Sequence, residues 1–97
     1  MPAAYVIVDA KVSDPERYKA YQALSPGAIA AAGGEFLARG GRSEVFEGTW
    51  TPSRIVVIRF PSLEAARAFY DSPLYVEARA ERAGLTEHFN MVVVEGI

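Results

Sequence analysis

The sequence predicts an α+β fold of order β-α-β-β-α-β, the ferredoxin-like arrangement with an antiparallel sheet. Three observations predict it. Four segments are rich in β-branched residues or alternate between apolar and polar residues, as strands do. Two longer segments carry apolar residues at helical spacing and separate the first strand from the second and the third from the fourth. The chain of 97 residues suffices for one core and not for two, so we expect residues 1–97 to form a single domain.

The first strand and helix are predicted in the N-terminal third of the chain. Residues 4–12 alternate and are expected to form a strand. A helix begins at residues 13–16, where a serine or aspartate cap precedes a proline suited to the first turn. Pro26 is expected to interrupt this helix, because proline lacks the backbone donor and disfavours helical geometry in the residue before it. A short second piece over residues 28–32 follows, and the glycine pair at 33–34 ends it.

The middle of the chain is expected to hold a broken second strand and a clear third one. Residues 35–39 and 43–47 both have an extended pattern, with Gly40 and Gly41 between them. Paired glycines permit a bulge, so the two pieces can belong to one bulged strand, and at least one glycine is expected to have a positive φ or to lie in the bulge. Residues 54–60, after a turn, form the clearest strand in the sequence.

The C-terminal third predicts the second helical region and the last strand. Ser62 is placed to cap a helix with an apolar stripe. Ser72 and Pro73 restart a helix, which Gly84 ends. Residues 89–95 are expected to form the last strand.

Composition and charge argue against several classes of protein. A chain without cysteine has no disulfides, thiolate zinc sites or cysteine nucleophiles, and its single histidine leaves no histidine-rich metal site. The net charge of −2 argues against nucleic-acid binding. No apolar stretch approaches the ~20 residues of a membrane span, and the N-terminus lacks the positive start of a signal peptide. We therefore expect a cytoplasmic protein that binds neither nucleic acid nor membrane and, since phosphate-binding loops are also missing, no metal or cofactor.

The two faces of the predicted sheet differ in chemistry. One set of alternating side chains is uniformly apolar and suits the face that the helices cover: Val6, Val8, Val12, Val56, Ile58 and Phe60. The opposite face mixes apolar and charged residues: Tyr5, Ile7, Asp9, Ile55, Val57 and Arg59, joined by Leu37 and Arg39 if the second strand keeps its pleat. That face is too apolar for water and too charged for a simple core. We therefore expect a homodimer in which a second sheet covers the apolar part and a cavity holds the charges.

Five motifs along the chain resemble the family called domain of unknown function 1330. They are Gly-Gly-Glu-Phe-Leu-Ala-Arg-Gly-Gly at 33–41, Glu-Val-Phe-Glu-Gly at 44–48, Pro-Ser-Arg-Ile-Val-Val-Ile-Arg-Phe-Pro-Ser at 52–62, Phe-Tyr-Asp-Ser-Pro-Leu-Tyr at 69–75 and Val-Glu-Gly at 94–96. The resemblance implies a dimeric α/β barrel, in which two ferredoxin-like units pack sheet to sheet. The wider superfamily includes small monooxygenases, isomerases and haem enzymes, so the fold alone does not select an activity.

The residues around Gly40 and Gly41 are the first candidates for ligand binding. Arg39 can hold a carboxylate with two parallel hydrogen bonds, and the glycines let the backbone approach a ligand. We predict that Arg39 reaches the polar end of a cavity on the mixed face or at its helix edge. The wider predicted ligand-binding set is Arg39, Glu44, Asp9, Arg59 and Trp50. In the alternative, structural interpretation Arg39 pairs with Asp9 or Glu44 and only fixes the strand.

Three side chains are candidates for proton transfer: Tyr21, Tyr70 and His88. Their ordinary roles are the alternative, because a tyrosine more often half-buries its ring in a core or interface, and a lone histidine more often lies at a surface or interface. Trp50, in a predicted turn, needs cover, which a dimer contact or a lid over a ligand can supply.

Three functions stay open on the sequence. The first is a cofactor-free enzyme that acts on a small carboxylate-bearing or aromatic molecule. The second is a ligand-binding or sensing module with the same pocket and no chemistry, and only the enzyme requires a proton-transfer group with a perturbed pKa in that pocket. The third is a structural dimerisation domain, which predicts a sheet face filled by the partner, without a cavity.

Overall fold

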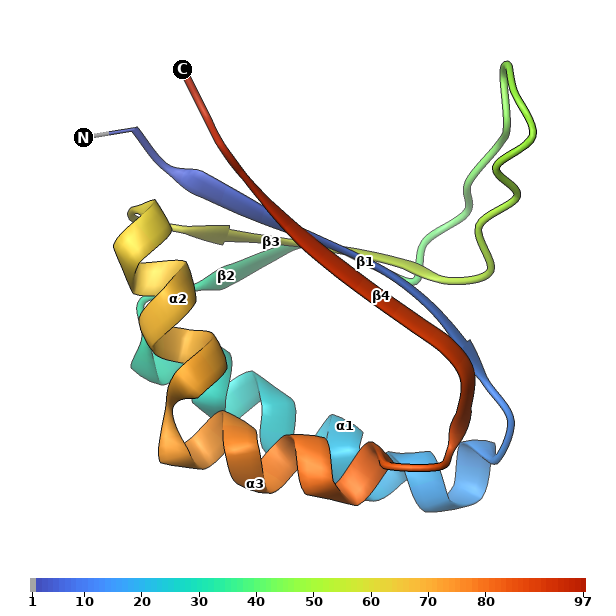
Figure 1. The fold of residues 1–97 in the computed structure, drawn as a ribbon, viewed down its shortest axis with the longest axis horizontal. Coiled ribbons are helices and arrows are strands. Elements are labelled where there is room, and N and C mark those ends of the chain that lie inside the picture. Colours follow the sequence, from blue (N-terminus) through green and yellow to red (C-terminus); the bar gives the residue numbers. More distant parts are fainter. Residues whose placement is uncertain (1) are drawn as a thin grey trace.

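A computed structural model describes residues 2–97 and contains one four-stranded antiparallel sheet with three helices on one side of it (Figure 1). The strand order is β2-β3-β1-β4. Along the chain the elements are β1 (Ala4–Val12), α1 (Pro15–Ala31), β2 (Glu35–Arg39), β3 (Ile55–Phe60), α2 (Leu63–Asp71), α3 (Pro73–Arg82) and β4 (Thr86–Glu95). This order and topology are those of the ferredoxin-like fold, so the predicted fold class is confirmed.

The sheet separates a covered side from an open one. The core lies on the helix side, where its most buried large side chains are Tyr75, Phe60 and Phe69. The opposite side of the sheet, which we call the outer face, has no helix over it within residues 2–97 (Figure 1). The apolar side chains of the outer face are half-buried or exposed: Tyr5, Ile7, Leu37, Ile55, Val57, Val92 and Val94. The predicted difference between the two faces is therefore confirmed.

Helix α1 is continuous where the sequence predicts an interruption. It begins after Asp14, whose carboxylate accepts a hydrogen bond from the Arg17 N–H at 3.2 Å, and it runs through Pro26. The predicted break is wrong because residues on both sides of Pro26 are buried, namely Ser25, Ala28 and Ile29. That packing outweighs the one backbone bond that proline removes. The predicted end is confirmed, since Gly33 follows the helix with a φ of 80°.

Two serines organise the second helical region as predicted. Ser62 Oγ accepts a hydrogen bond from the Ala65 N–H at 3.0 Å at the start of α2. Ser72 lies between α2 and α3, where its Oγ donates to the Phe69 carbonyl at 2.7 Å and accepts from the Tyr75 N–H at 3.2 Å. The same side chain therefore closes one helix and opens the next.

Strand β4 begins at Thr86, earlier than the predicted residue 89. His88 therefore lies within the strand, where it pairs with Lys11 of β1. The neighbouring Glu87 forms an ion pair with Lys11, with 3.3 Å between Oε2 and Nζ.

Residues 41–54 form a long loop, and the predicted extended segment at 43–47 is not a strand. The reason is that β3 begins at Ile55, whose carbonyl already accepts a hydrogen bond from the Gly40 N–H at 2.8 Å, so residues beyond Gly40 have no strand beside them. Their apolar side chains are left exposed, and Phe46 is 90% accessible. Gly40 has a φ of 71°, which confirms the predicted positive φ at the end of β2.

A bulge in β2 determines which way Arg39 points. Phe36 pairs with Ile58 and Arg39 pairs with Val56, both on the helix side, and the register shifts between them because Leu37 is an extra residue. In a regular strand Arg39 would alternate to the outer face. The strand does not keep its pleat, which was the condition for placing Arg39 on the mixed face, and Arg39 therefore faces the helices.

Candidate functional site

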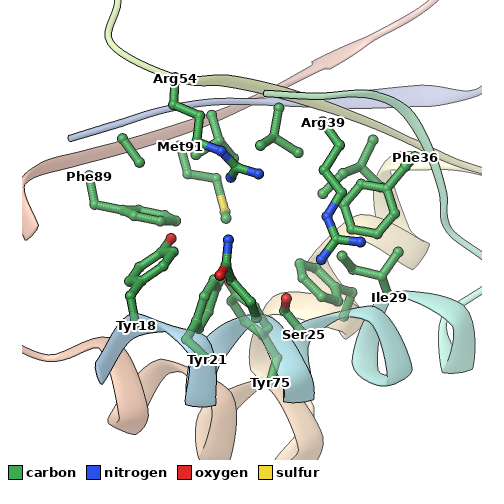
Figure 2. A pocket seen from close by; sticks show the side chains of 16 residues that line it. Tyr18, Tyr21, Ser25, Ile29, Phe36, Arg39, Arg54, Tyr75, Phe89 and Met91 are labelled. Carbon is green, nitrogen blue, oxygen red and sulfur yellow. The ribbon is translucent and has the colours of Figure 1, made fainter. Parts of the chain in front are cut away.

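A pocket lies between the sheet and the helices, and Figure 2 shows the side chains that line it. Six of them are aromatic: Tyr18, Tyr21, Phe36, Phe69, Tyr75 and Phe89. Polar groups enter from α1, through Gln22 and Ser25, and from the sheet, through Arg39 and Arg54. The cavity volume of the pocket is about 30 Å³, and the empty space is about 470 Å³ when the open solvent at its mouth is included. We call it the helix-side pocket.

Two arginine side chains point into the helix-side pocket (Figure 2). The Arg39 guanidinium lies over the Phe36 ring, 4.6 Å from its centroid. Arg54 is half-buried and lies against Gly40, so that an added Cβ at Gly40 would be 2.6 Å from Arg54 Nε. Within residues 2–97, no carboxylate oxygen comes within 4.0 Å of either guanidinium. The pocket therefore holds two positive charges that no acidic side chain of the described chain neutralises.

Arg54 is a site residue that the sequence analysis missed, although the pattern contained it. The alternation that places Val56 and Ile58 on the helix side places Arg54 there as well. The Ala10 N–H donates to the Arg54 carbonyl at 3.0 Å and holds this residue beside β1. Extending the apolar set by one step toward the N-terminus would have identified Arg54.

Two tyrosines of the pocket, Tyr18 and Tyr21, have raised pKa values. The buried hydroxyls of Tyr21 and Tyr75 are 2.7 Å apart. Burial raises the pKa of Tyr21 well above its usual value, and the neighbouring Tyr75 hydroxyl raises it further. Burial also raises the pKa of Tyr18, although the charges of Arg82 and Arg54 act in the opposite direction. The Tyr21 hydroxyl therefore keeps its proton and can donate a hydrogen bond in this pocket, whereas its raised pKa disfavours transfer of the proton itself.

Three of the predicted site residues, Tyr70, Arg59 and Glu44, belong neither to the helix-side pocket nor to the cluster around Asp9 described below. Tyr70 is exposed, and its ring centroid is 4.2 Å from the guanidinium carbon of Arg79. Arg59 forms an ion pair with Glu35, with 3.5 Å between Nη1 and Oε1. Glu44 lies exposed in the loop 41–54. None of the three side chains lines the helix-side pocket.

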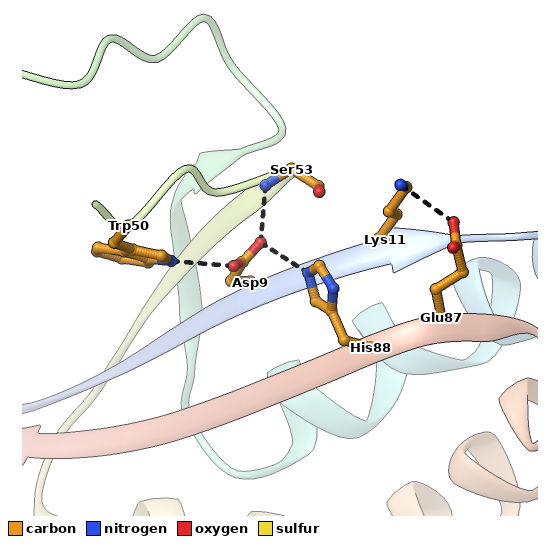
Figure 3. Close-up of polar contacts among 6 residues, drawn as sticks. All are labelled: Asp9, Lys11, Trp50, Ser53, Glu87 and His88. Atoms are coloured by element: carbon orange, nitrogen blue, oxygen red, sulfur yellow. Dashed lines mark hydrogen bonds and ion pairs between the residues drawn. The ribbon is translucent and has the colours of Figure 1, made fainter.

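A second polar cluster lies on the outer face around Asp9 (Figure 3). Asp9 is 7% exposed and accepts hydrogen bonds from the Ser53 N–H at 2.9 Å and from the Trp50 indole N–H at 3.1 Å. His88 Nε2 lies 3.4 Å from Asp9 Oδ1. Burial acts to raise the pKa of Asp9, but the bonds from Ser53, Trp50 and His88 outweigh it and lower the pKa below its usual value. Asp9 thereby ties the loop 41–54 to the sheet.

The outer cluster brings together three of the predicted site residues, but Arg39 is not among them. Asp9, Trp50 and His88 come together on the outer face, whereas Arg39 points to the helix side. The alternative prediction that Arg39 pairs with Asp9 is therefore wrong, and the reason is again the bulge in β2. His88 is likewise on the wrong face to exchange a proton with a ligand in the helix-side pocket.

No cluster of three or more histidine, aspartate or glutamate side chains that could hold a metal ion occurs in residues 2–97. His88 and Asp9 form a pair of such side chains on the outer face. Within the same described range, no helix has the length and apolar character needed to cross a membrane.

A comparison with protein families finds one match. The model of the family described as Domain of unknown function (DUF1330) matches residues 3–97. No curated protein matches the sequence. The matched range includes every residue that lines the helix-side pocket and every residue of the outer cluster.

Several solved structures have a similar fold. A protein of unknown function from Rhodopseudomonas palustris superimposes with a TM-score of 0.80 at 17% identity, covering 99% of this chain and 83% of that one. A dimeric ferredoxin-like protein of unknown function from Thermobifida fusca has a TM-score of 0.66 at 16% identity, covering 98% and 92%. SnoaB, a cofactor-independent oxygenase from Streptomyces nogalater, has a TM-score of 0.66 at 12% identity, covering 100% and 95%. At these identities the likeness concerns the fold alone.

Proposed function

Because the chain belongs to the DUF1330 family, whose description assigns no activity, we propose a function from the helix-side pocket: the protein binds a small aromatic molecule that bears a carboxylate. One observation carries the proposal. Arg39 and Arg54 face a pocket of aromatic rings, and within residues 2–97 no carboxylate lies within 4.0 Å of either guanidinium. A ligand carboxylate supplies the missing negative charge.

The chemistry of the pocket lining supports this class of ligand. A guanidinium is planar, stays charged and presents donors that match the two oxygens of a carboxylate. Burial among the pocket walls strengthens the attraction between the half-buried Arg54 and an anion, whereas the Arg39 side chain is exposed. The same walls offer ring faces and edges to a flat apolar body. A molecule with a carboxylate at one end and an aromatic ring at the other meets both requirements.

A cofactor-free enzyme that acts on such a molecule is the second candidate, and Tyr21 is the residue that favours it. Its hydroxyl keeps its proton, is bonded to that of Tyr75 and lines the pocket, so it is placed to stabilise negative charge that develops on a ligand oxygen by donating a hydrogen bond. The S. nogalater protein of the same fold is described as a cofactor-independent oxygenase, which supports chemistry without a bound cofactor. In this candidate function Tyr21→Phe abolishes turnover and leaves ligand binding in place.

The outer face supports a homodimer joined sheet to sheet. Its seven apolar side chains have no cover within residues 2–97, and Trp50 beside them is 59% exposed. Two sheets that pack face to face bury such side chains and leave the helix-side pockets free. The similar structure from T. fusca is described as dimeric, which supports the same assembly for this chain.

Calorimetric titration with benzoate and its neutral analogue benzamide tests the proposed function. We expect benzoate to bind at least about tenfold more tightly than benzamide, because the amide lacks the charge that the arginines recognise. Arg39→Gln and Arg54→Gln should each weaken benzoate binding by about tenfold or more. Arg59→Gln is the matched control, since this arginine already pairs with Glu35 on the outer face. Equal affinities for benzoate and benzamide, or equal losses in all three variants, would contradict the proposal.

A further inference from the structure

A groove runs beside β4, on the helix side of the sheet. β4 is an edge strand, and the groove is lined mainly by residues of β4 and of helices α2 and α3. Its apolar lining consists mainly of Val6, Phe69, Phe89, Met91 and Val93, and its polar lining consists of Arg67, Tyr70, Asp71 and Arg82. The empty space in the groove is about 1000 Å³, compared with about 470 Å³ in the helix-side pocket. We call it the β4-edge groove.

The helix-side pocket and the β4-edge groove share part of their lining. Phe69, Phe89 and Met91 line both spaces, so these three side chains are what the two have in common. Phe89 and Met91 are only partly buried, in contrast to the core residues around them. The two spaces are therefore neighbours that meet at a boundary made of apolar side chains.

The boundary is held by weak contacts. The Arg82 guanidinium lies 3.7 Å from the centroid of the Phe89 ring, and its buried Nε has no hydrogen-bond partner within residues 2–97. No hydrogen bond or ion pair fixes the side chains of Phe89 or Met91, and methionine adapts its shape readily. A change of rotamer at these two positions breaks apolar contacts, the cation–π contact with Arg82 and the edge-to-face contact between Phe89 and Tyr21, and no hydrogen bond or ion pair.

We infer that the ligand is amphipathic, with a carboxylate head at Arg39 and Arg54 and an apolar tail that passes Phe89 and Met91 into the β4-edge groove. The inference rests on the proposed function and extends it from a head group to the class of the whole molecule. The cavity volume of the helix-side pocket, about 30 Å³, is too small for the whole of such a ligand, whereas the groove offers further apolar surface for a tail. The tail passes from the pocket to the groove at the side chains that line both spaces.

A comparison of benzoate with 4-butylbenzoate tests the inference. The two probes share the head group and differ only in an apolar tail, so we expect calorimetric titration to show at least about tenfold tighter binding of 4-butylbenzoate. Val93→Glu places a charge in the groove and should abolish the gain from the butyl group without changing the affinity for benzoate. Val76→Glu, on an exposed position of α3 outside the groove, is the matched control.

A second measurement does not depend on any variant. In NMR spectra of the wild-type complex with 4-butylbenzoate, the terminal methyl group of the ligand should show nuclear Overhauser effects to the methyl groups of Val6 and Val93. Equal affinities for the two probes, or equal weakening of both by Val93→Glu, would overturn the inference and leave the proposed function in place. Binding of neither probe would overturn both proposals.

Discussion

Gly40 has two roles beside the helix-side pocket. Its φ of 71° lies in the left-handed region, which L side chains rarely adopt. It also leaves room for Arg54, because an added Cβ would be 2.6 Å from Arg54 Nε. The adjacent Gly41 is different, since nothing lies within 4 Å of an added Cβ at that position. Of the two neighbouring glycines, only Gly40 is required by the backbone and by the pocket.

Gly40→Ala is expected to lower the free energy of unfolding by about 1–2 kcal/mol, the cost of holding an L residue in the left-handed region. It should also displace the Arg54 guanidinium and weaken benzoate binding. Gly41→Ala is the control and should change both quantities little. Urea denaturation and calorimetric titration measure the two effects, and identical behaviour of the two variants would show that Gly40 is not special.

Asp9 is a residue whose charge the structure stabilises. Its carboxylate accepts hydrogen bonds from the loop backbone at Ser53 and from the Trp50 indole, and these bonds lower its pKa below the usual value of 3.8. The pKa is therefore lower in the folded than in the unfolded chain. The resulting stabilisation is complete above the unfolded-state pKa and is lost as the pH falls through the folded-state pKa.

Asp9→Asn, which keeps the size of the side chain and removes its charge, is expected to unfold more easily than the wild type near neutral pH. The difference in the free energy of unfolding should shrink as the pH falls below about 4, where Asp9 becomes protonated first in the unfolded chain and then, at lower pH, in the folded one. Urea denaturation over a pH series measures this difference. Trp50 is the only tryptophan in the chain, so its fluorescence reports the loop in the same samples. A difference that stays constant with pH would show that the charge of Asp9 does not hold the loop.

Among the elements, helices α1 and α3 are joined by a hydrogen bond between two phenols. Tyr21 of α1 and Tyr75 of α3 have hydroxyls 2.7 Å apart, and their rings meet edge to face with centroids 6.1 Å apart. Tyr75 has no accessible surface, so its hydroxyl depends on this partner. Removing one hydroxyl leaves the other buried without its partner in the chain.

Tyr75→Phe is expected to lower the free energy of unfolding by about 1–3 kcal/mol, because the Tyr21 hydroxyl is then unsatisfied. The double variant Tyr21→Phe/Tyr75→Phe should recover much of this loss, since it leaves no unpaired hydroxyl. Urea denaturation of the wild type, both single variants and the double variant gives the coupling free energy between the two side chains. Losses that simply add would indicate that the two hydroxyls do not interact.

Some of the elements could be predicted from the sequence alone, and others could not. The strand at residues 4–12 has the predicted bounds, because its alternation is a local pattern. The predicted break at Pro26 is wrong, because burial on both sides of the proline is a tertiary property that keeps the helix intact. The predicted extended segment at 43–47 is also not a strand, for a related reason: a strand needs a neighbouring strand with which to pair.

The residues of the candidate site could likewise be predicted only in part from the sequence. The sequence points to Arg39 and Tyr21, which the structure brings together in one pocket. It does not reveal that Asp9 and His88 lie on the opposite side of the sheet from Arg39, because a bulge at Leu37 is one extra residue with no distinct pattern of its own. The roles of these residues in binding and catalysis stay predictions.

In the molecule as a whole, the sheet separates two proposed tasks. Ligand binding belongs to the helix side, and association with a second copy belongs to the outer face. The outer cluster around Asp9 lies on the association side and anchors the loop that leads to Arg54 on the pocket side. The residues where this loop returns to the sheet therefore contribute to both proposed functions, ligand binding and association.

Val57→Lys is expected to separate the homodimer into monomers, because an unpaired charge would otherwise be buried between two sheets. Val76→Lys is the matched control, since Val76 is 48% exposed on α3, away from the outer face. Light scattering at micromolar concentration measures the particle mass, which should be twice that of one chain for the wild type and the control. A wild-type particle with the mass of one chain would contradict the homodimer.

The bulge at Leu37 makes the charge of the pocket depend on the number of residues in β2. Successive side chains of a strand point to opposite sides of the sheet. Whether the number of residues between Phe36 and the loop is odd or even therefore determines the side to which Arg39 points. Deleting Leu37 restores a regular ladder and leaves Arg39 opposite Val56, still facing the helices. Keeping all five residues of β2 but forcing them into a regular ladder turns Arg39 outward and puts Ala38 in its place. A shortened strand can therefore keep the arginine in the pocket, whereas straightening the strand at full length removes it with no change of sequence at position 39.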